Sequence, residues 1–264
     1  MEPYHVLDDR RNIAIPGDHD VTIAFAADLW IDMAREAIVD HGFFAVALSG
    51  GSTPKKIYQR LSALEDQLDW SKVFLFWSDE RSVGPTNEAS NYHMAMEEGG
   101  LNKLPIPQNQ IFRMVAEEEI EANAKGYEDI ILDKLGSHPF DLVMLGMGDD
   151  GHTASLFPHT QALTIKGRLV VPNFVPQNNS WRMTFTYECI NRSNNICLYV
   201  VGAPKAEVLE KVLLGPPKPD EYPSQLIGTE AQPALWILDN EAGKNLTAHL
   251  KYVRESFRYR KHLR

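Results

Sequence analysis

Short, nearly continuous apolar runs recur along the chain and alternate with longer amphipathic segments. Such runs are typical of strands that are buried on both faces of a sheet. In chain order they are "FFAVALS", "VFLFW", "FDLVMLGMG", "NICLYVVG" and "ALWILD". The segments "RLVVPNFV" and "RMTFTYECI" predict further extended stretches between the third and the fourth run.

The segments between these runs carry apolar residues at helical spacing. Helices are predicted over 24–39, from 54 to about 64, over 89–98, 117–135 and 205–214. Gly42 is the expected stop of the first helix, and Thr53 and Pro54 are the expected N-cap and first residue of the second. Leu246, Leu250, Val253 and Phe257 predict a closing C-terminal helix.

Strands that alternate with helices predict an α/β fold. We expect a mostly parallel, Rossmann-like open sheet covered by helices on both faces. One domain should span residues 1–264, with a basic C-terminal helix or tail from about residue 244. Such sheets bind ligands beyond the carboxyl ends of their strands, where the strand order reverses.

Composition narrows the class of partner. The 264 residues are 44% hydrophobic and 23% charged, and the formal net charge is −10, which argues against a broad nucleic-acid surface. Cys189 and Cys197 lie within or beside apolar runs and are expected as reduced core residues. The start "MEPYHVLDDRR" has no apolar leader and no run reaches 18 apolar residues, so we expect a cytoplasmic protein without a membrane partner. We expect a monomer or a small homo-oligomer.

The first predicted strand ends in "LSGGSTP", a stretch that fits either a turn or an anion site. Gly50 and Gly51 allow positive φ and close approach of a ligand to the backbone, and Ser52 and Thr53 add hydroxyl groups. The free N–H groups and the dipole at the start of the following helix attract an anion. The same residues also suit a plain strand-to-helix turn.

Three cations lie near other strand ends. "WSDERSVG" places Asp79, Glu80 and Arg81 directly after a buried strand, where they form either a surface charge cluster or part of a site. Lys205 falls in the first turn of a predicted helix, where a cation opposes the helix dipole and needs an anionic partner, either a ligand or an acidic side chain. Arg182 opens the extended run "RMTFT", as an edge-strand surface residue or a ligand-binding one.

The stretch "LGMGDDGHTASLFP" gathers the strongest candidate chemistry. His152 lies in a glycine-rich turn, and Asp150, two residues earlier, could fix its tautomer and orientation. Asp149, Asp150 and His152 could also hold a metal ion, but no second histidine lies at a helical ligand spacing, so we expect no metal. Together with the cations and the glycine turn, this pair predicts a phosphorylated substrate and proton-transfer chemistry. The residues alone do not name the bond that is broken.

These motifs resemble those of a known family. "LSGGSTPKKIY", "WSDERSVGPTNEASNY", "GMGDDGHTASLFP", "WRMTFT" and "GAPKAEVL" are similar, in the same order, to the motifs of the 6-phosphogluconolactonases, over about residues 45–239. The family's fold is similar to that of glucosamine-6-phosphate deaminase and ribose-5-phosphate isomerase. Asp79-Glu80-Arg81 in place of the deaminases' "DEY", and "GHTASLFP" in place of their "GHIGFNEP", favour the lactonase branch.

The resemblance implies hydrolysis of 6-phosphoglucono-1,5-lactone to 6-phosphogluconate, in the oxidative pentose phosphate pathway. It implies that His152 is the general base and Asp150 its neighbouring carboxylate. It also implies that Arg81 and Lys205 are cations on the phosphate or ring side, and that residues 50–53 hold the sugar phosphate. A histidine suits the deprotonation of an attacking water near neutral pH, and neither a metal ion nor a cofactor is required.

Two other functions remain to be weighed. An amino-sugar-phosphate deaminase or aldose–ketose isomerase on the same fold would add a carboxylate that moves a proton between C1 and C2, and Asp79 could serve. A sugar-phosphate-sensing regulator would carry an N-terminal DNA-binding helix-turn-helix. Only about twenty residues precede the first predicted helix and the chain is acidic, so we do not expect a regulator.

Overall fold

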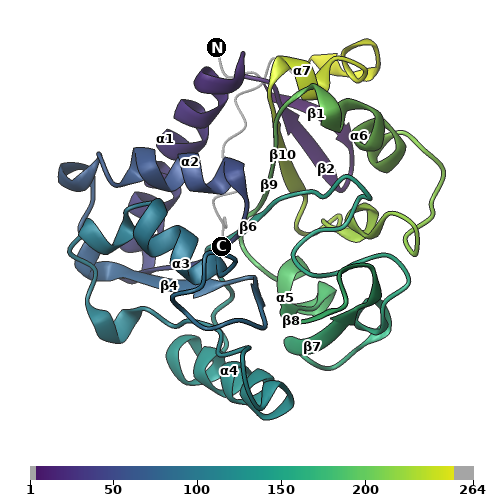
Figure 1. The fold of residues 1–264 in the computed structure, drawn as a ribbon. Coiled ribbons are helices and arrows are strands. Elements are labelled where there is room, and N and C mark those ends of the chain that lie inside the picture. Colours follow the sequence, from purple (N-terminus) through teal and green to yellow (C-terminus); the bar gives the residue numbers. More distant parts are fainter. Residues whose placement is uncertain (1–3, 253–264) are drawn as a thin grey trace.

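The computed structural model describes residues 4–252. Within them, an eight-stranded sheet has the strand order β11-β1-β2-β10-β9-β6-β3-β4 (Figure 1). Its strands are β1 (Tyr4–Asp8), β2 (Arg11–Ala14), β3 (Phe44–Leu48), β4 (Val73–Trp77), β6 (Leu142–Leu145), β9 (Ile196–Val200), β10 (Ala234–Leu238) and β11 (Lys251–Tyr252). Neighbours from β2 to β4 pair in parallel, whereas β1 is antiparallel to both β2 and β11. The mostly parallel open sheet predicted from the sequence is therefore confirmed.

A second, antiparallel sheet was not predicted. It consists of β5 (Asp79–Arg81), β8 (Ser180–Phe185) and β7 (Val170–Val175), in that order. The extended segments around residues 170 and 182 are thus confirmed as strands, but the end of the second one is helical. Thr186 accepts a hydrogen bond from the Cys189 amide and starts α5 (Tyr187–Asn191), so the strand ends at Phe185.

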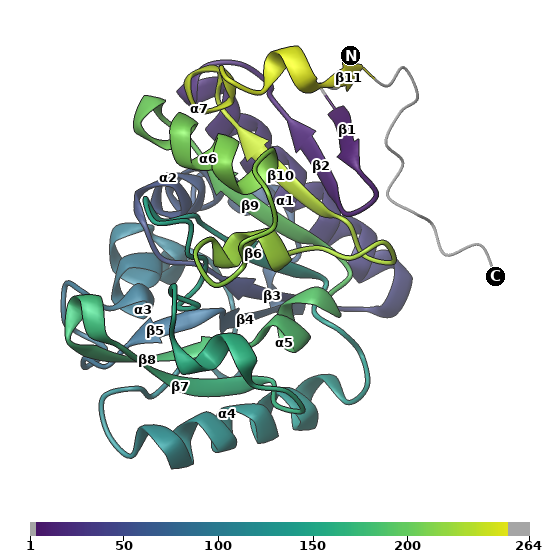
Figure 2. The same ribbon diagram turned by 90° about the vertical axis from the view of Figure 1, so that its right-hand side faces the viewer.

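Helices cover both faces of the main sheet. The longer ones are α1 (His19–His41), α2 (Ser52–Leu61), α4 (Ile120–Leu135) and α6 (Ala206–Leu213), and the shorter ones are α3 (Asn91–His93), α5 and α7 (Asn240–Gly243). Figure 1 shows α1 and α2 on one side of the parallel strands and α5 and α6 on the other. Figure 2 shows α4 along the outer side of β7, against which it packs.

The observed helix ends match those predicted from the sequence only in part. Gly42 ends α1 with a φ of 93°, as predicted. The predicted N-cap Thr53 is wrong: Gly51, at a φ of 106°, precedes the first helical residue and Thr53 lies inside the first turn of α2. The positive φ of Gly51 completes the turn out of the strand, so the helix starts before Thr53 can cap it. The segment predicted as one helix over 89–98 is α3 followed by a π turn over Met94–Glu98.

The predicted C-terminal helix is also wrong within the described residues. Asp239 caps the short α7, a 3₁₀ turn over Thr247–His249 follows, and the chain then joins the sheet as β11. Leu246 is buried in the core. Burial of Leu246 in the core explains why this position is apolar although no helix forms. Val253 and Phe257 lie outside the described residues.

Both cysteines lie in the core, as expected from the sequence. Cys189 and Cys197 are buried and unpaired, and burial raises the pKa of the Cys197 thiol to about 12. No helix in the range 4–252 is long and apolar enough to cross a membrane.

The sheet has one feature that points to a ligand site. From β3 the chain crosses to β4 on one side, whereas from β6 it crosses to β9 on the other, and β3 and β6 are neighbours. This reversal of strand order leaves a crevice beyond the carboxyl ends of β3 and β6. The glycine turn after β3 and the His152 turn after β6 both lie there.

Candidate active site

Two adjoining hollows lie beyond the carboxyl ends of the strands. One, of about 330 Å³, is lined by the glycine turn, by Gly146–Gly148 and by Lys205. The other, of about 390 Å³, is lined by Asp150, Phe157 and Arg182 among others. Their shared lining residues are Asp79, Arg81, His152 and Ala154. Every residue that the sequence predicted as catalytic or substrate-binding lines one or both hollows: Gly50, Gly51, Ser52, Thr53, Arg81, Asp150, His152, Arg182 and Lys205.

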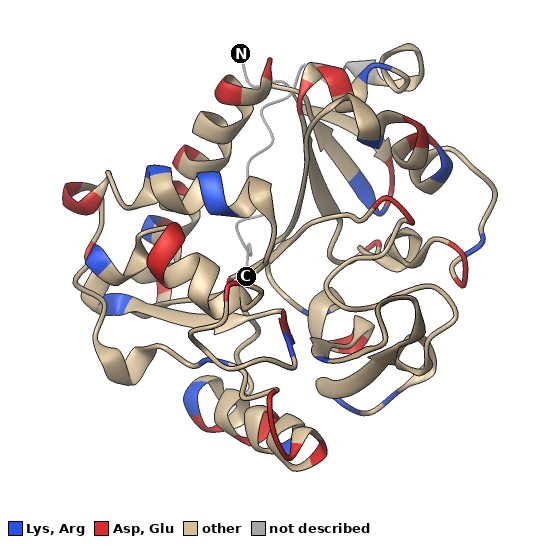
Figure 3. Ribbon diagram, in the orientation of Figure 1, with Lys and Arg blue, Asp and Glu red and all other residues tan. Residues whose placement is uncertain are grey.

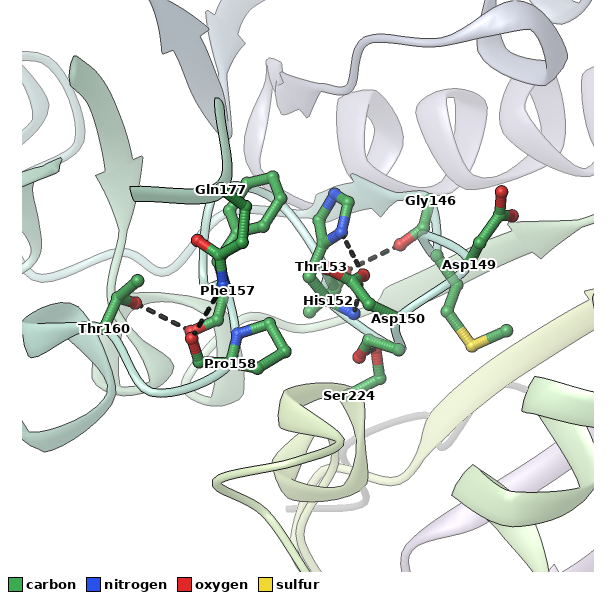
Figure 4. A network of polar contacts seen from close by, with 12 residues as sticks. Gly146, Asp149, Asp150, His152, Thr153, Phe157, Pro158, Thr160, Gln177 and Ser224 are labelled. Atoms are coloured by element: carbon green, nitrogen blue, oxygen red, sulfur yellow. Dashed lines mark hydrogen bonds and ion pairs between the residues drawn. The ribbon is translucent and has the colours of Figure 1, made fainter. Parts of the chain in front are cut away.

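His152 and Asp150 form a hydrogen-bonded pair between the hollows (Figure 4). Asp150 Oδ1 lies 2.6 Å from Nδ1 of His152 and also accepts the His152 amide at 3.1 Å. Partial burial acts to raise the pKa of the Asp150 carboxyl, but its hydrogen bond and charge interaction with His152 outweigh burial, and the pKa lies below its ordinary value. An ionised carboxylate only accepts, so Nδ1 carries the proton and Nε2 of neutral His152 is left as the basic nitrogen.

Glycines make room for this ring. A Cβ on Gly148 would lie 2.1 Å from Nδ1 of His152, so only glycine fits there without moving the imidazole. Gly151 has a φ of +77°, and a Cβ there would approach Tyr222 to 2.9 Å. Phe157 stacks on the imidazole, with ring centroids 3.8 Å apart and an interplanar angle of 19°. The turn therefore holds the ring in one orientation.

The glycine turn after β3 opens onto the first hollow. A Cβ on Gly50 would lie 2.0 Å from Oδ1 of Asn91, so the close approach of these two residues requires glycine. The first amides of α2, including those of Ser52 and Thr53, lie beyond the reach of carbonyls of their own helix. Lys56, in the first hollow's lining, is a further cation here, and Figure 3 shows basic residues on α2. The turn is thus built to accept an anion.

Two arginines lie opposite each other on neighbouring strands of the small sheet. Arg81 of β5 and Arg182 of β8 are register partners, and both line the second hollow. Like charges placed directly opposite destabilise a sheet. Burial lowers the pKa of Arg182, while the nearby carboxylate of Asp79 acts in the opposite sense. Such a pair is favourable where an anion joins it, so this end of the site also suits an anionic group.

Lys205 is placed differently from the prediction. It ends a 3₁₀ turn over Ala203–Lys205 and directly precedes α6, rather than lying in the first turn of that helix. Its ammonium group donates to the Met147 carbonyl at 2.9 Å and to Asp149 Oδ1 at 2.5 Å. An acidic side chain is therefore one anionic partner of Lys205. The Lys205 side chain is 25% exposed and lines the first hollow.

The sequence pointed to Asp79 and Glu80 but not to the contacts that they make. Glu80 accepts the amides of Arg81, Asn91 and Tyr92, and Asp79 accepts from Ser155 Oγ at 2.6 Å and from Asn91 Nδ2 at 3.1 Å. These bonds join β5 to the start of α3 and to the segment that carries Ser155. Burial raises the pKa of the Glu80 carboxyl, although the backbone amides oppose that effect. The contact of Asp79 with Ser155 joins residues far apart in the chain, so no local pattern in the sequence reveals it.

The fold and the site define the class as an open-sheet α/β enzyme with its site at the point where the strand order reverses. More narrowly, the chain belongs to the glucosamine-6-phosphate isomerases/6-phosphogluconolactonase family, whose model matches residues 17–236.

Relatives of known name cover most of the chain. A 6-phosphogluconolactonase of Chlamydia pneumoniae is 40% identical over 238 residues, which is 89% of this chain and 91% of that relative. A 6-phosphogluconolactonase of a Synechocystis species is 39% identical over 217 residues, 80% of this chain and 88% of the relative. Among solved structures, the 6-phosphogluconolactonase from Trypanosoma cruzi superposes with a TM-score of 0.79 at 26% identity, covering 92% of this chain and 99% of that one.

Proposed function

We propose that this enzyme hydrolyses 6-phosphoglucono-1,5-lactone to 6-phosphogluconate. The names of the relatives support this substrate. The observation that carries the chemistry is the His152–Asp150 pair, held at 2.6 Å between two hollows that are lined by Arg81, Arg182 and Lys205.

In the proposed reaction, Nε2 of His152 takes a proton from a water molecule as that water attacks C1 of the lactone. Asp150 holds the Nδ1 proton, fixes the tautomer and stabilises the imidazolium that forms. Phe157 keeps the ring in place. The tetrahedral intermediate collapses with cleavage of the bond from C1 to the ring oxygen, and that oxygen takes up the proton held by His152 and becomes the 5-hydroxyl group.

The cations and the glycine turn would orient the substrate. The turn over residues 50–53 and Lys205 line one hollow and Arg182 lines the other, with Arg81 common to both. We assign the 6-phosphate to this set of donors, because phosphate is bound by helix N-termini and by guanidinium groups. Anchoring a group remote from C1 lowers the entropic cost of placing the carbonyl against the water. We further propose that the reaction serves the oxidative pentose phosphate pathway in the cytoplasm, without a metal ion or cofactor, in a monomer or small homo-oligomer.

Deamination or isomerisation of a sugar phosphate is the alternative. It requires a carboxylate that is free to move a proton between C1 and C2, and Asp79 lines both hollows. Both Asp79 oxygens, however, already accept hydrogen bonds, from Ser155 and from Asn91. This arrangement favours a structural role for Asp79 over proton shuttling.

Parallel assays decide between the two. The purified protein is given freshly prepared 6-phosphogluconolactone, glucosamine 6-phosphate or ribose 5-phosphate, and spontaneous lactone opening is subtracted with a protein-free sample. We expect turnover with the lactone alone. Turnover of glucosamine 6-phosphate or ribose 5-phosphate, with the lactone opening at its spontaneous rate, would overturn the proposal.

A further inference from the structure

A second histidine–aspartate group lies at the other end of the sheet. His41 is the last residue of α1, His138 follows α4, and Asp141 directly precedes β6. Among residues 4–252, this is the one group of three His, Cys, Asp or Glu side chains whose ligand atoms all lie within 4.8 Å of one another. The His152 turn follows the carboxyl end of β6, so the two groups are separated by the length of that strand.

The distances within this group suit a metal ion. Nε2 of His41 lies 3.3 Å from Oδ2 of Asp141. Ligand bonds of about 2.0–2.1 Å in a tetrahedral zinc site place neighbouring ligand atoms about 3.3–3.4 Å apart. His138 lies within 4.8 Å of both, so a shift of about 1–1.5 Å in its loop would complete three corners of a tetrahedron.

Supporting hydrogen bonds orient all three side chains. Nδ1 of His138 lies 2.7 Å from the Pro139 carbonyl, which fixes the proton on Nδ1 and leaves the lone pair on Nε2. Nδ1 of His41 lies 3.4 Å from Oδ2 of Asp40. Histidine ligands in metal sites donate their other ring N–H in just this manner to a carbonyl or a carboxylate.

The carboxylate is held in the same way. Asp141 is buried, its Oδ2 accepts the Ala45 amide at 2.9 Å and its Oδ1 accepts from Asn194 at 3.2 Å. When the proton of neutral His41 lies on Nδ1, toward Asp40, Nε2 of His41 and Oδ2 of Asp141 face one another as two acceptors, and a bound cation would join them. The His41 side chain is 19% exposed, so an ion can enter from solvent.

We propose that His41, His138 and Asp141 form a binding site for a divalent transition-metal ion, with Zn²⁺ as the ion whose geometry fits best. Two imidazoles and one carboxylate are ligands that zinc accepts, with water in the fourth position. The ion would join the end of α1 to the loop that leads into β6. It would so stabilise the end of the sheet opposite the pocket, where β6 begins.

The proposal is tested by calorimetric titration of Zn²⁺ into chelator-treated full-length protein. All samples carry His152→Asn, so that the His152–Asp150 pair does not compete for the metal ion. We expect one site per chain, weakened more than about 100-fold by His41→Ala and by His138→Ala, since removal of even a supporting residue costs about 10–100-fold. The matched control is His249→Ala, which removes an exposed histidine outside the group and should leave the affinity unchanged.

Stability gives an independent readout. Zn²⁺ at about 100 times its Kd should raise Tm by about 5–10 °C in the control and not in His138→Ala. Should His41→Ala fail to fold, His138→Ala decides alone, because it leaves the bonds of Asp141 to Ala45 and Asn194 in place. No Zn²⁺ binding in the control, or equal binding and an equal Tm rise in His138→Ala, would overturn the proposal. In that case a proton on His41 fills the gap to Asp141.

Discussion

Two histidine–aspartate pairs lie at opposite ends of β6, in opposite surroundings. His152 and Asp150 lie in a glycine-rich turn at the carboxyl end of β6, with the Asp150 side chain 43% exposed. His41 and Asp141 lie at its amino end, with the Asp141 side chain 4% exposed. His152 lies on Phe157 and faces two hollows, whereas His41 packs against His138 and meets the edge of Phe43.

The difference teaches that the surroundings set the chemistry of a histidine–aspartate pair. Partial burial is outweighed by His152 at Asp150, and the pKa of that carboxyl lies below its ordinary value. At Asp141, burial outweighs the neighbouring histidines and raises the pKa. An ionised, accessible partner suits repeated proton transfer on His152. A buried partner suits a fixed charge pair or a bound cation.

The largest expected effect separates the two histidines. His152→Asn keeps the approximate size and a hydrogen-bonding group but cannot take a proton, so kcat for the lactone should fall by about 10²–10⁴-fold. His41→Asn should leave kcat within about twofold, because the reacting atoms are at the other end of β6. Stopped assays with subtraction of the spontaneous reaction measure both, and 6-phosphogluconate binding checks the fold of each variant. Similar losses in the two variants would refute the assignment of the base.

The second-largest effect is expected at a cation near the His152–Asp150 pair. Arg182→Ala should raise KM for the phosphorylated lactone by about 10–150-fold, the equivalent of one charge-assisted hydrogen bond of about 1.5–3 kcal/mol. The effect should be much smaller for glucono-1,5-lactone, which lacks the phosphate. Thermal stability should stay the same or rise, because the variant removes a like charge opposite Arg81. The control is Arg60→Ala, on the exposed face of α2. Equal KM changes for both lactones would place Arg182 away from the phosphate.

The main strands and the His152–Asp150 pair could be predicted from sequence, because the signals for them are local. The apolar runs predict β3, β4, β6, β9 and β10, and the glycine-rich stretches after them place Gly50 and His152 at strand ends. Contacts between nearby residues, such as that of Asp150 with His152, follow from spacing alone.

Long-range pairings could not be predicted in this way. Arg81 meets Arg182 only because β5 pairs with β8, and a three-residue strand has no hydrophobic pattern of its own. His41, His138 and Asp141 belong to three segments whose proximity is set by the packed sheet. The N-cap of α2 was missed for a different reason, since the backbone of Gly51 rather than the side chain of Thr53 determines where that helix starts.

A smaller effect is expected at the carboxylate of the catalytic pair. Asp150→Asn should lower kcat by about tenfold, less than the loss of the base itself. The variant should also shift the pH dependence of kcat/KM in one direction. Asp150 is ionised because its pKa is lowered, so its charge favours the imidazolium form of His152. Without that charge, His152 gives up its proton more readily, and the acid limb of the kcat/KM profile should move to lower pH. Movement to higher pH would mean that the carboxylate does not stabilise the imidazolium.

The smallest effect is expected at the stacked ring. Phe157→Leu should lower kcat by about two- to fivefold with little change in KM, which corresponds to about 0.5–1 kcal/mol of ring stacking. Phe157→Tyr keeps the ring and should restore kcat, which a general loss of packing would not predict. The matched control is Phe43→Leu, which removes the ring that meets His41 at a centroid distance of 4.6 Å. It should lower Tm without changing kcat, because His41 has no part in the proposed hydrolysis. If the two leucine variants reduce kcat equally, Phe157 acts through overall stability and does not position the His152 imidazole.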